Sequence, residues 1–138
     1  MKLKRDLALL DAEVTSDRFF NFVITARHLP EWLEKDPTCN SSAVAANLVP
    51  LKASAIYRAC RDIADASKHF SLNQRRQDQT DVTHVDSGQG YGIGRFGHGA
   101  FGVGEELISI SLSDGTEWDA RVFAHELAAQ FESLFLEV

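Results

Sequence analysis

Apolar residues recur at helical spacing along much of the chain, and this spacing predicts most of its secondary structure. Leucines at positions 3, 7 and 10 predict a first helix over residues 2–13. A second helix is predicted over residues 18–29, with Ser16 as its N-cap. Its apolar stripe consists of Phe19, Phe22, Val23, Ala26 and Leu29. We expect Pro30 to kink this helix or to restart it as a short turn that carries Trp32 and Leu33.

Two further helices are predicted in the middle and at the end of the chain. Residues 36–47 are rich in Ser, Asn and Thr and indicate a loop, with room for one helical turn at 43–46. The third helix is expected from Asn47 to Phe70, with Pro50 in its first turn and an inward stripe of Ile56, Cys60, Ile63, Ser67 and Phe70. The last helix is predicted over about 120–137, and the residues expected on its inward face are Phe123, Leu127, Phe131, Leu134 and Phe135.

A glycine-rich stretch and a hairpin precede the last helix. Residues 88–104 hold eight of the nine glycines of the chain, which predicts a loop because glycine loses the most entropy on ordering. Residues 106–112 alternate polar and β-branched side chains and meet Asp114-Gly115, a strong hairpin signal, with a return strand over 116–119. Residues 116–119 also match a capping box, so both assignments stay open where the hairpin meets the last helix.

These elements predict a mostly α protein. We expect one domain over residues 1–138: a bundle of about four helices, with a loop and hairpin insertion at about 82–119 before the C-terminal helix. Residues 73–79 are expected to be a solvated exit from the third helix.

Charge and cysteine content narrow the partners and the location. The formal net charge of −6 works against RNA binding and against anionic membranes, because both depend on clustered Lys and Arg. We found neither a signal peptide nor an apolar run long enough to span a bilayer, so we expect a cytoplasmic protein that does not bind membranes. Cys39 and Cys60 have no CxxC spacing and are interpreted as reduced thiols, Cys60 in the core.

The second half of the third predicted helix carries the densest set of ionisable side chains. At about 100° per residue, one stripe contains Arg58, Asp62, Asp65 and His69, while Tyr57, Arg61 and Lys68 lie beyond it. Ion pairs of Arg58 with Asp62 and of Arg61 with Asp65 would explain these residues structurally. A functional interpretation makes His69 a general base and an arginine the phosphate ligand. A divalent metal site is a further alternative, assembled from Asp17, His28, Asp62, Asp65 and His69.

Other polar signals are weaker. Asn21, Thr25 and His28 interrupt the very apolar second helix and are interpreted as hydrogen-bonding groups inside the bundle. Two GxGxxG matches within residues 92–102 lack the strand and helix of a dinucleotide site, and the single arginine nearby is too little for a nucleic-acid platform. His125-Glu126 begins an HExxH-like pattern, but Ala129 stands where the second zinc ligand would be.

Two segments of the chain resemble known proteins. Residues 21–26, Asn-Phe-Val-Ile-Thr-Ala, which lead to residues 29–32, Leu-Pro-Glu-Trp, form the first segment, and residues 60–70, Cys-Arg-Asp-Ile-Ala-Asp-Ala-Ser-Lys-His-Phe, form the second. Both resemble uncharacterised bacterial and phage-associated helical proteins. Those proteins are in turn similar to the HEPN superfamily. The superfamily's helical bundles often dimerise, and its active members are ribonucleases that need no metal. Their signature is an arginine, four to six residues and then a histidine, whereas seven residues separate Arg61 from His69 here.

The resemblance implies a function and a site as expectations. It implies a homodimer that cleaves or binds RNA in a defence or mobile-element system, without metal or cofactor, with Arg61 binding phosphate, His69 moving protons and Asp65 orienting them. The wide spacing puts cleavage in doubt unless the site is shared across a dimer or the helix ends before His69. The alternative is a non-catalytic protein-interaction module, of the inhibitor or immunity type, that contacts a protein partner through its acidic surface or through the glycine-rich loop at 88–104.

Overall fold

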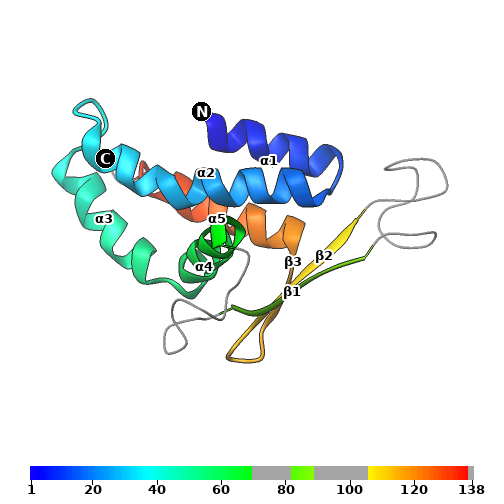
Figure 1. The fold of residues 1–138 in the computed structure, drawn as a ribbon. Helices are drawn as coiled ribbons and strands as arrows, with labels where there is room; N and C mark the ends of the chain where they lie inside the picture. Colours follow the sequence, from blue (N-terminus) through cyan, green and yellow to red (C-terminus); the bar gives the residue numbers. More distant parts are fainter. Residues whose placement is uncertain (70–81, 89–105, 137–138) are drawn as a thin grey trace.

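A computed structural model describes residues 1–69, 82–88 and 106–136, with the backbone alone at 67–69, 82–84 and 86–88. Within these residues it contains five helices and a three-stranded sheet, so the mostly α fold class predicted from the sequence is confirmed (Figure 1). The helices are α1 (Lys2–Ala12), α2 (Ser16–Lys35), α3 (Ser42–Ala53), α4 (Ala55–His69) and α5 (Ala120–Ser133). The strands are β1 (Val82–Gly88), β2 (Leu107–Leu112) and β3 (Glu117–Asp119).

Helix α2 is the centre of the bundle. It contacts the other four helices, α1 and α4 most extensively, and α1 also packs on α5. The predicted stripe of α2 is confirmed, because its members are all buried: Phe19, Phe22, Val23, Ala26 and Leu29. Edge-to-face packing joins Phe19 to Phe123 of α5, which brings the two ends of the chain into one core. None of the helices in the described ranges has the length and apolar content needed to cross a membrane.

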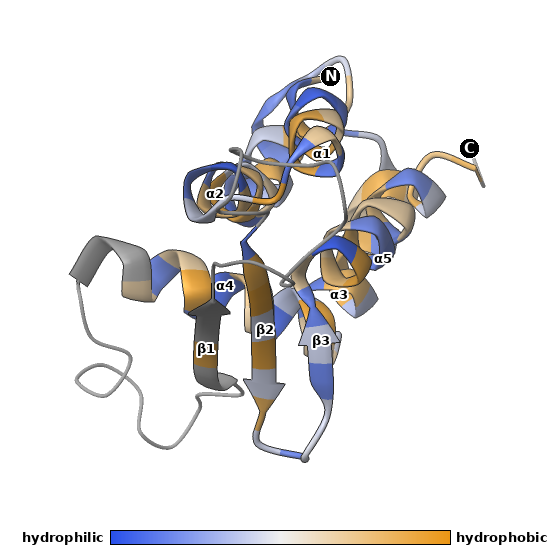
Figure 2. Cartoon of the chain, turned by 90° about the vertical axis from the view of Figure 1, so that its right-hand side faces the viewer, coloured by the Kyte–Doolittle hydropathy of each residue, from blue (hydrophilic) through white to orange (hydrophobic). Residues whose placement is uncertain are grey.

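The sheet is antiparallel in the order β1-β2-β3 and lies beside α5 (Figure 2). The predicted hairpin of β2 and β3 is confirmed, and Gly115 takes the left-handed φ of 87° that its turn requires. Every second residue of β2 is buried, namely Ile108, Ile110 and Leu112. Strand β1 was not among the predicted elements, although it supplies an edge of the sheet.

The third predicted helix is in fact two helices, and the expectation of one helix from Asn47 was wrong. Helix α3 already begins at Ser42, after an N-cap by Ser41, and ends at Ala53. Ser54 then takes an extended conformation. Its hydroxyl donates to the carbonyl of Leu51 (2.7 Å) and accepts from the backbone N–H of Tyr57 (3.3 Å). One serine therefore closes α3 and caps α4.

Two expectations for α2 were also wrong, namely a restart at Pro30 and Ser16 as the N-cap, while the alternative of a kink at Pro30 stays a prediction. The helix does not restart at Pro30 but continues to Lys35, because Pro30 is buried together with Leu29 and Leu33 and this packing offsets the missing backbone bond. Its N-cap is Thr15 and not Ser16, with the Thr15 hydroxyl accepting from the backbone N–H of Arg18 (3.2 Å).

Near the end of the chain, α5 begins at the predicted residue, Ala120, with Asp119 as its N-cap. The helix ends at Ser133, and Phe135 is 41% exposed, so its predicted inward position was wrong. The predictions for residues 73–79, for the glycine-rich loop beyond Gly88 and for Phe70 lie outside the described residues.

Candidate functional site

Three polar side chains of α4, those of Tyr57, Cys60 and Asp65, contact α2. Arg27 of α2 forms the ion pair between the two helices. Its Nε lies 3.7 Å from the Oδ1 of Asp65, and its Nη1 donates to the Oε1 of Glu31 at 3.1 Å. The two partners of the interhelical pair are partly shielded from solvent, with 23% of the Arg27 side chain and 33% of the Asp65 side chain exposed. The hydrogen bond from Arg27 lowers the pKa of Glu31 below its usual value. Asp65 therefore serves an ion pair between helices.

Two hydrogen bonds from α4 strengthen this junction. The hydroxyl of Tyr57 donates to the carbonyl of Arg27 (3.0 Å), and the thiol of Cys60 donates to the carbonyl of Val23 (3.4 Å). Burial raises the pKa of Tyr57 to about 12 and raises the pKa of the Cys60 thiol well above its usual range. Cys60 is therefore an inert core thiol, as predicted, and not a nucleophile.

Arg61 lies at the edge of the same junction. Its Nη2 is 3.9 Å from the Oδ1 of Asp62, whose side chain is buried, with 5% of it exposed. A quarter of the Arg61 side chain is exposed. Its Nε is buried and has no hydrogen-bond partner among the described residues. Among the described residues, the guanidinium thus has a long contact with the buried carboxylate of Asp62, and part of its surface is open to solvent.

The helix geometry separates the two predicted catalytic residues. His69 is the last residue of α4, so the helix does not end before it, and its side chain lies outside the described part of the chain. Along an unbroken helix, eight residues place Arg61 and His69 about 12 Å apart along the axis and about 80° apart around it. The structure brings Asp65 to Arg27 of α2, and α4 itself does not bring Arg61 and His69 to one point of its surface.

Two alternative roles were considered for the polar residues of α4, namely ion pairs within the helix and ligands of a metal site. Within the described residues, the partner of Asp65 is Arg27 and not Arg61. For the predicted metal site, no group of three His, Cys, Asp or Glu side chains able to hold an ion occurs among the side chains that the structure describes. Asp17 and His28, two of its proposed ligands, are 11 positions apart on α2, which is about 16 Å along that helix.

The polar insertions of α2 have separate roles. Thr25 is buried, and its hydroxyl donates to the Oδ2 of Asp6 in α1 at 2.6 Å. Lys2 completes this network through contacts with the carboxylate of Asp6 (2.6 Å) and with the Thr25 hydroxyl. The prediction of hydrogen bonding inside the bundle is confirmed for Thr25. His28 instead stacks on the half-exposed Trp32, with ring centroids 6.4 Å apart, and Asn21 is exposed.

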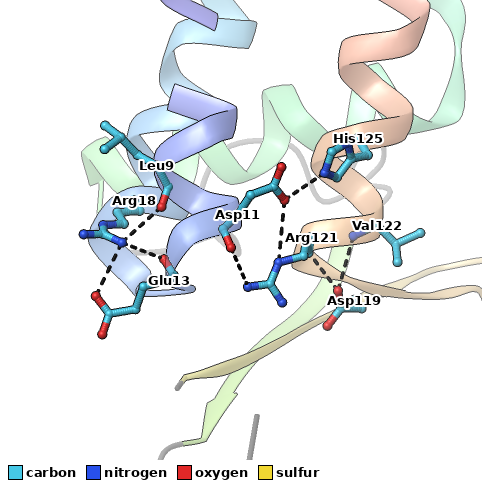
Figure 3. Close-up of polar contacts among 8 residues, drawn as sticks. All are labelled: Leu9, Asp11, Glu13, Arg18, Asp119, Arg121, Val122 and His125. Carbon is cyan, nitrogen blue, oxygen red and sulfur yellow. Dashed lines mark hydrogen bonds and ion pairs between the residues drawn. The ribbon is translucent and has the colours of Figure 1, made fainter. Parts of the chain in front are cut away.

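A second polar cluster joins α1 to α5 (Figure 3). The Oδ1 of Asp11 lies 2.8 Å from the Nε2 of His125 and 3.6 Å from the Nε of Arg121, while an Nη of Arg121 donates to the carbonyl of Asp11 (3.3 Å). His125 of the HExxH-like pattern therefore pairs with a carboxylate. Sequence reasoning missed this cluster, because more than a hundred residues separate Asp11 from its partners and no local pattern signals the contact.

A search of known proteins adds no relative. The chain matches no protein-family model, no curated protein and no solved structure. The similarity to HEPN proteins accordingly remains a prediction from residues 21–32 and 60–70.

Proposed function

We propose that this chain is a non-catalytic protein-interaction module that acts in the cytoplasm as a homodimer, of the inhibitor or immunity type. The observation that carries the proposal is the ion pair of Asp65 with Arg27. A residue that was a candidate for orienting a catalytic histidine is held by another helix, and its neighbours Tyr57 and Cys60 bond to the backbone of that helix. Packing against α2 thereby explains Tyr57, Cys60 and Asp65 without a catalytic role.

Charge and thiols support the rest of the proposal. The net charge of −6 suits a basic protein partner. Among the side chains that the structure describes, the exposed acidic ones are Asp17, Glu34, Asp36, Asp114, Glu117, Asp119, Glu126 and Glu132. Cys39 and Cys60 are both free thiols, which is usual for proteins of a reducing compartment. The glycine-rich residues 89–105 remain a second predicted contact. The strands on either side of this segment are paired with each other, Gly88 with Leu107, so a short linker can replace the segment.

An RNA cleavage assay tests the proposal that the chain is not a catalyst. Purified wild type and His69→Ala protein are incubated with fluorescently labelled single-stranded RNA in the presence of a chelator. We expect neither protein to cut the RNA. Cleavage by the wild type that is lost in His69→Ala would contradict the proposal.

Capture of a partner tests the interaction part. Immobilised wild type is compared with a variant in which a short Gly-Asn linker replaces residues 89–105 and Glu106 is kept, because Glu106 accepts from the backbone N–H of Ser16. A captured protein supports the proposal when, once purified, it rebinds the wild type and binds more weakly as salt is raised. Binding that salt leaves unchanged would argue against the acidic surface, and full binding by the variant would argue against the glycine-rich segment.

One observation favours RNA cleavage or binding as a second candidate function. A quarter of the Arg61 side chain is exposed and its contact with Asp62 is long, at 3.9 Å, so the exposed part of the guanidinium could donate to a phosphate oxygen. Under this alternative, Arg61→Lys would weaken RNA binding because Lys lacks the forked donors. The same labelled RNA, titrated at low salt into wild type and Arg61→Lys, distinguishes the two functions, since the interaction module predicts equally weak binding by both proteins.

A further inference from the structure

Helix α3 has a single charged residue and is apolar over most of its circumference, although only one side of it is buried. Val44, Leu48 and Leu51 point into the core. The opposite side contains six exposed residues without a single charge: Ser42, Ala45, Ala46, Val49, Pro50 and Ala53. Of these, Val49 is 68% exposed. A helix that is apolar all round is normally covered on every side, so the outer face of α3 has the composition of a buried surface.

A hollow adjoins this face. It lies between α3 and the end of α5, has a volume of about 290 Å³ and is open to solvent, with a lining of Asn47, Pro50, Leu51, Gln130, Ser133 and Leu134. Pro50 belongs to both features, so the convex helix face continues into the concave hollow. In Figure 1, α3 forms the outer edge of the bundle, where a second molecule has access to it.

We infer that two copies of this chain pair through the outer face of α3, each seating part of its α3 against the hollow of the other. This inference rests on the proposed function, for which it names one partner and the contact surface. A two-fold interface requires one patch that is complementary to itself, and a ridge beside a hollow meets that requirement. The alanines of the face allow two helices to approach closely.

Charge selects a second copy as the occupant. Each copy carries a net charge of −6, so two copies repel wherever their acidic surfaces meet. The outer face of α3 avoids this repulsion. The one charged residue of α3 is Lys52, at the rim of the face, and its Nζ is already paired with the carboxylate of Glu34. A basic partner would instead find its complement on the acidic surface, which leaves the uncharged face for self-association.

The size of the surface sets the expected affinity. The contact consists of helix α3, which has 12 residues and is about 18 Å long, together with the adjoining hollow. Its area is therefore at the small end of the range for specific protein–protein interfaces. We therefore expect a dimer that dissociates on dilution, with a Kd on the order of micromolar.

Sedimentation of the full chain over a concentration series tests the inference. For the wild type we expect the average mass to rise from 15.3 kDa towards twice that value and to stop there. Val49→Glu and Ala46→Glu would each place a carboxylate in the contact and should raise the dimer Kd by about tenfold or more. The matched control is Val122→Glu, since Val122 is 57% exposed on α5 and is not part of the α3 face; this variant should dimerise like the wild type. Circular dichroism shows whether each variant is folded.

Each other outcome overturns the inference. If the wild type stays monomeric at all concentrations, a second copy does not occupy the outer face of α3. If that monomer also binds a hydrophobic dye and Val49→Glu does not, the face is a contact for a different protein. Dimers that form equally well in Val49→Glu and Ala46→Glu exclude this face, and masses beyond the dimer exclude a closed two-fold pair. A monomeric wild type would contradict the homodimer of the proposed function as well, whereas dimers that do not use α3 would contradict only the inference. None of these results bears on RNA cleavage or on capture of a different protein, so the non-catalytic interaction function is tested separately.

Discussion

The ion pair between Arg27 and Asp65 makes a quantitative prediction, because a structural residue and a catalytic residue respond in opposite ways to substitution. At 3.7 Å, two unit charges attract by roughly 1 kcal/mol in water and by roughly 4–5 kcal/mol at the effective dielectric constant of a protein surface. Fully exposed pairs yield only about 0.2–1 kcal/mol when measured. With 23% and 33% of the two side chains exposed, we expect a coupling free energy of about 1 kcal/mol.

A double-mutant cycle measures this coupling. Wild type, Arg27→Gln, Asp65→Asn and the double variant are unfolded in urea at one fixed protein concentration, because a dimer makes stability depend on concentration. Asp65→Asn should lower the free energy of unfolding by about 1 kcal/mol. Arg27→Gln should cost more, since it also loses the hydrogen bond to Glu31. The double variant should be more stable than the sum of the two single losses predicts.

The opposite result would refute the structural role. Residues kept for catalysis commonly cost stability, so replacing them tends to stabilise the fold. An Asp65→Asn variant that is more stable than the wild type, or a coupling below about 0.3 kcal/mol, would show that the pair does not hold α2 to α4.

Two further predictions concern buried polar groups of the same bundle. Thr25→Val removes the hydroxyl that donates to the buried Asp6 and should lower the free energy of unfolding in urea by about 1–3 kcal/mol. The control is Asn21→Ala, at an exposed position of α2, which should change this free energy by less than about 0.5 kcal/mol. Equal losses in the two variants would contradict the role of Thr25. Because folding raises the pKa of Tyr57 from 10.0 to about 12, the proton is bound more tightly in the folded state, so its contribution is present below pH 10 and is lost as the pH rises to about 12. Between pH 10 and 12, the free energy of unfolding should therefore fall by up to about 2–3 kcal/mol less in Tyr57→Phe than in the wild type. Equal falls in the two proteins would contradict the raised pKa of Tyr57.

The elements that follow from local pattern were predictable. The stripe of α2, the hairpin turn at Asp114-Gly115 and the start of α5 each depend on residues close in sequence, and each was correctly predicted. The break at Ser54 had a local signal that was overlooked. Ser54 lies between the buried stripe of α3, which includes Leu48 and Leu51, and the buried stripe of α4. A serine at such a position can cap the following helix with its hydroxyl.

Other features depend on contacts between distant segments, and no periodicity in the sequence reports them. The apolar side chains of strand β1 are Val82 and Val85 alone, and its other residues are polar or glycine. The strand forms because β2, which follows the glycine-rich residues, pairs with it. Continuation of α2 through Pro30 depends on burial by other helices. For the candidate site, sequence placed the charges of α4 correctly on one helix, but the partner of Asp65 lies 38 positions away, on α2.

The comparison of RNA cleavage by wild type and His69→Ala tests the central claim most directly, because it asks whether the polar face of α4 has a chemical role besides joining α4 to α2. With chelator present and protein in excess over a labelled RNA, we predict that the RNA stays intact with both proteins. Cleavage by the wild type together with intact RNA in the His69→Ala sample would contradict the account.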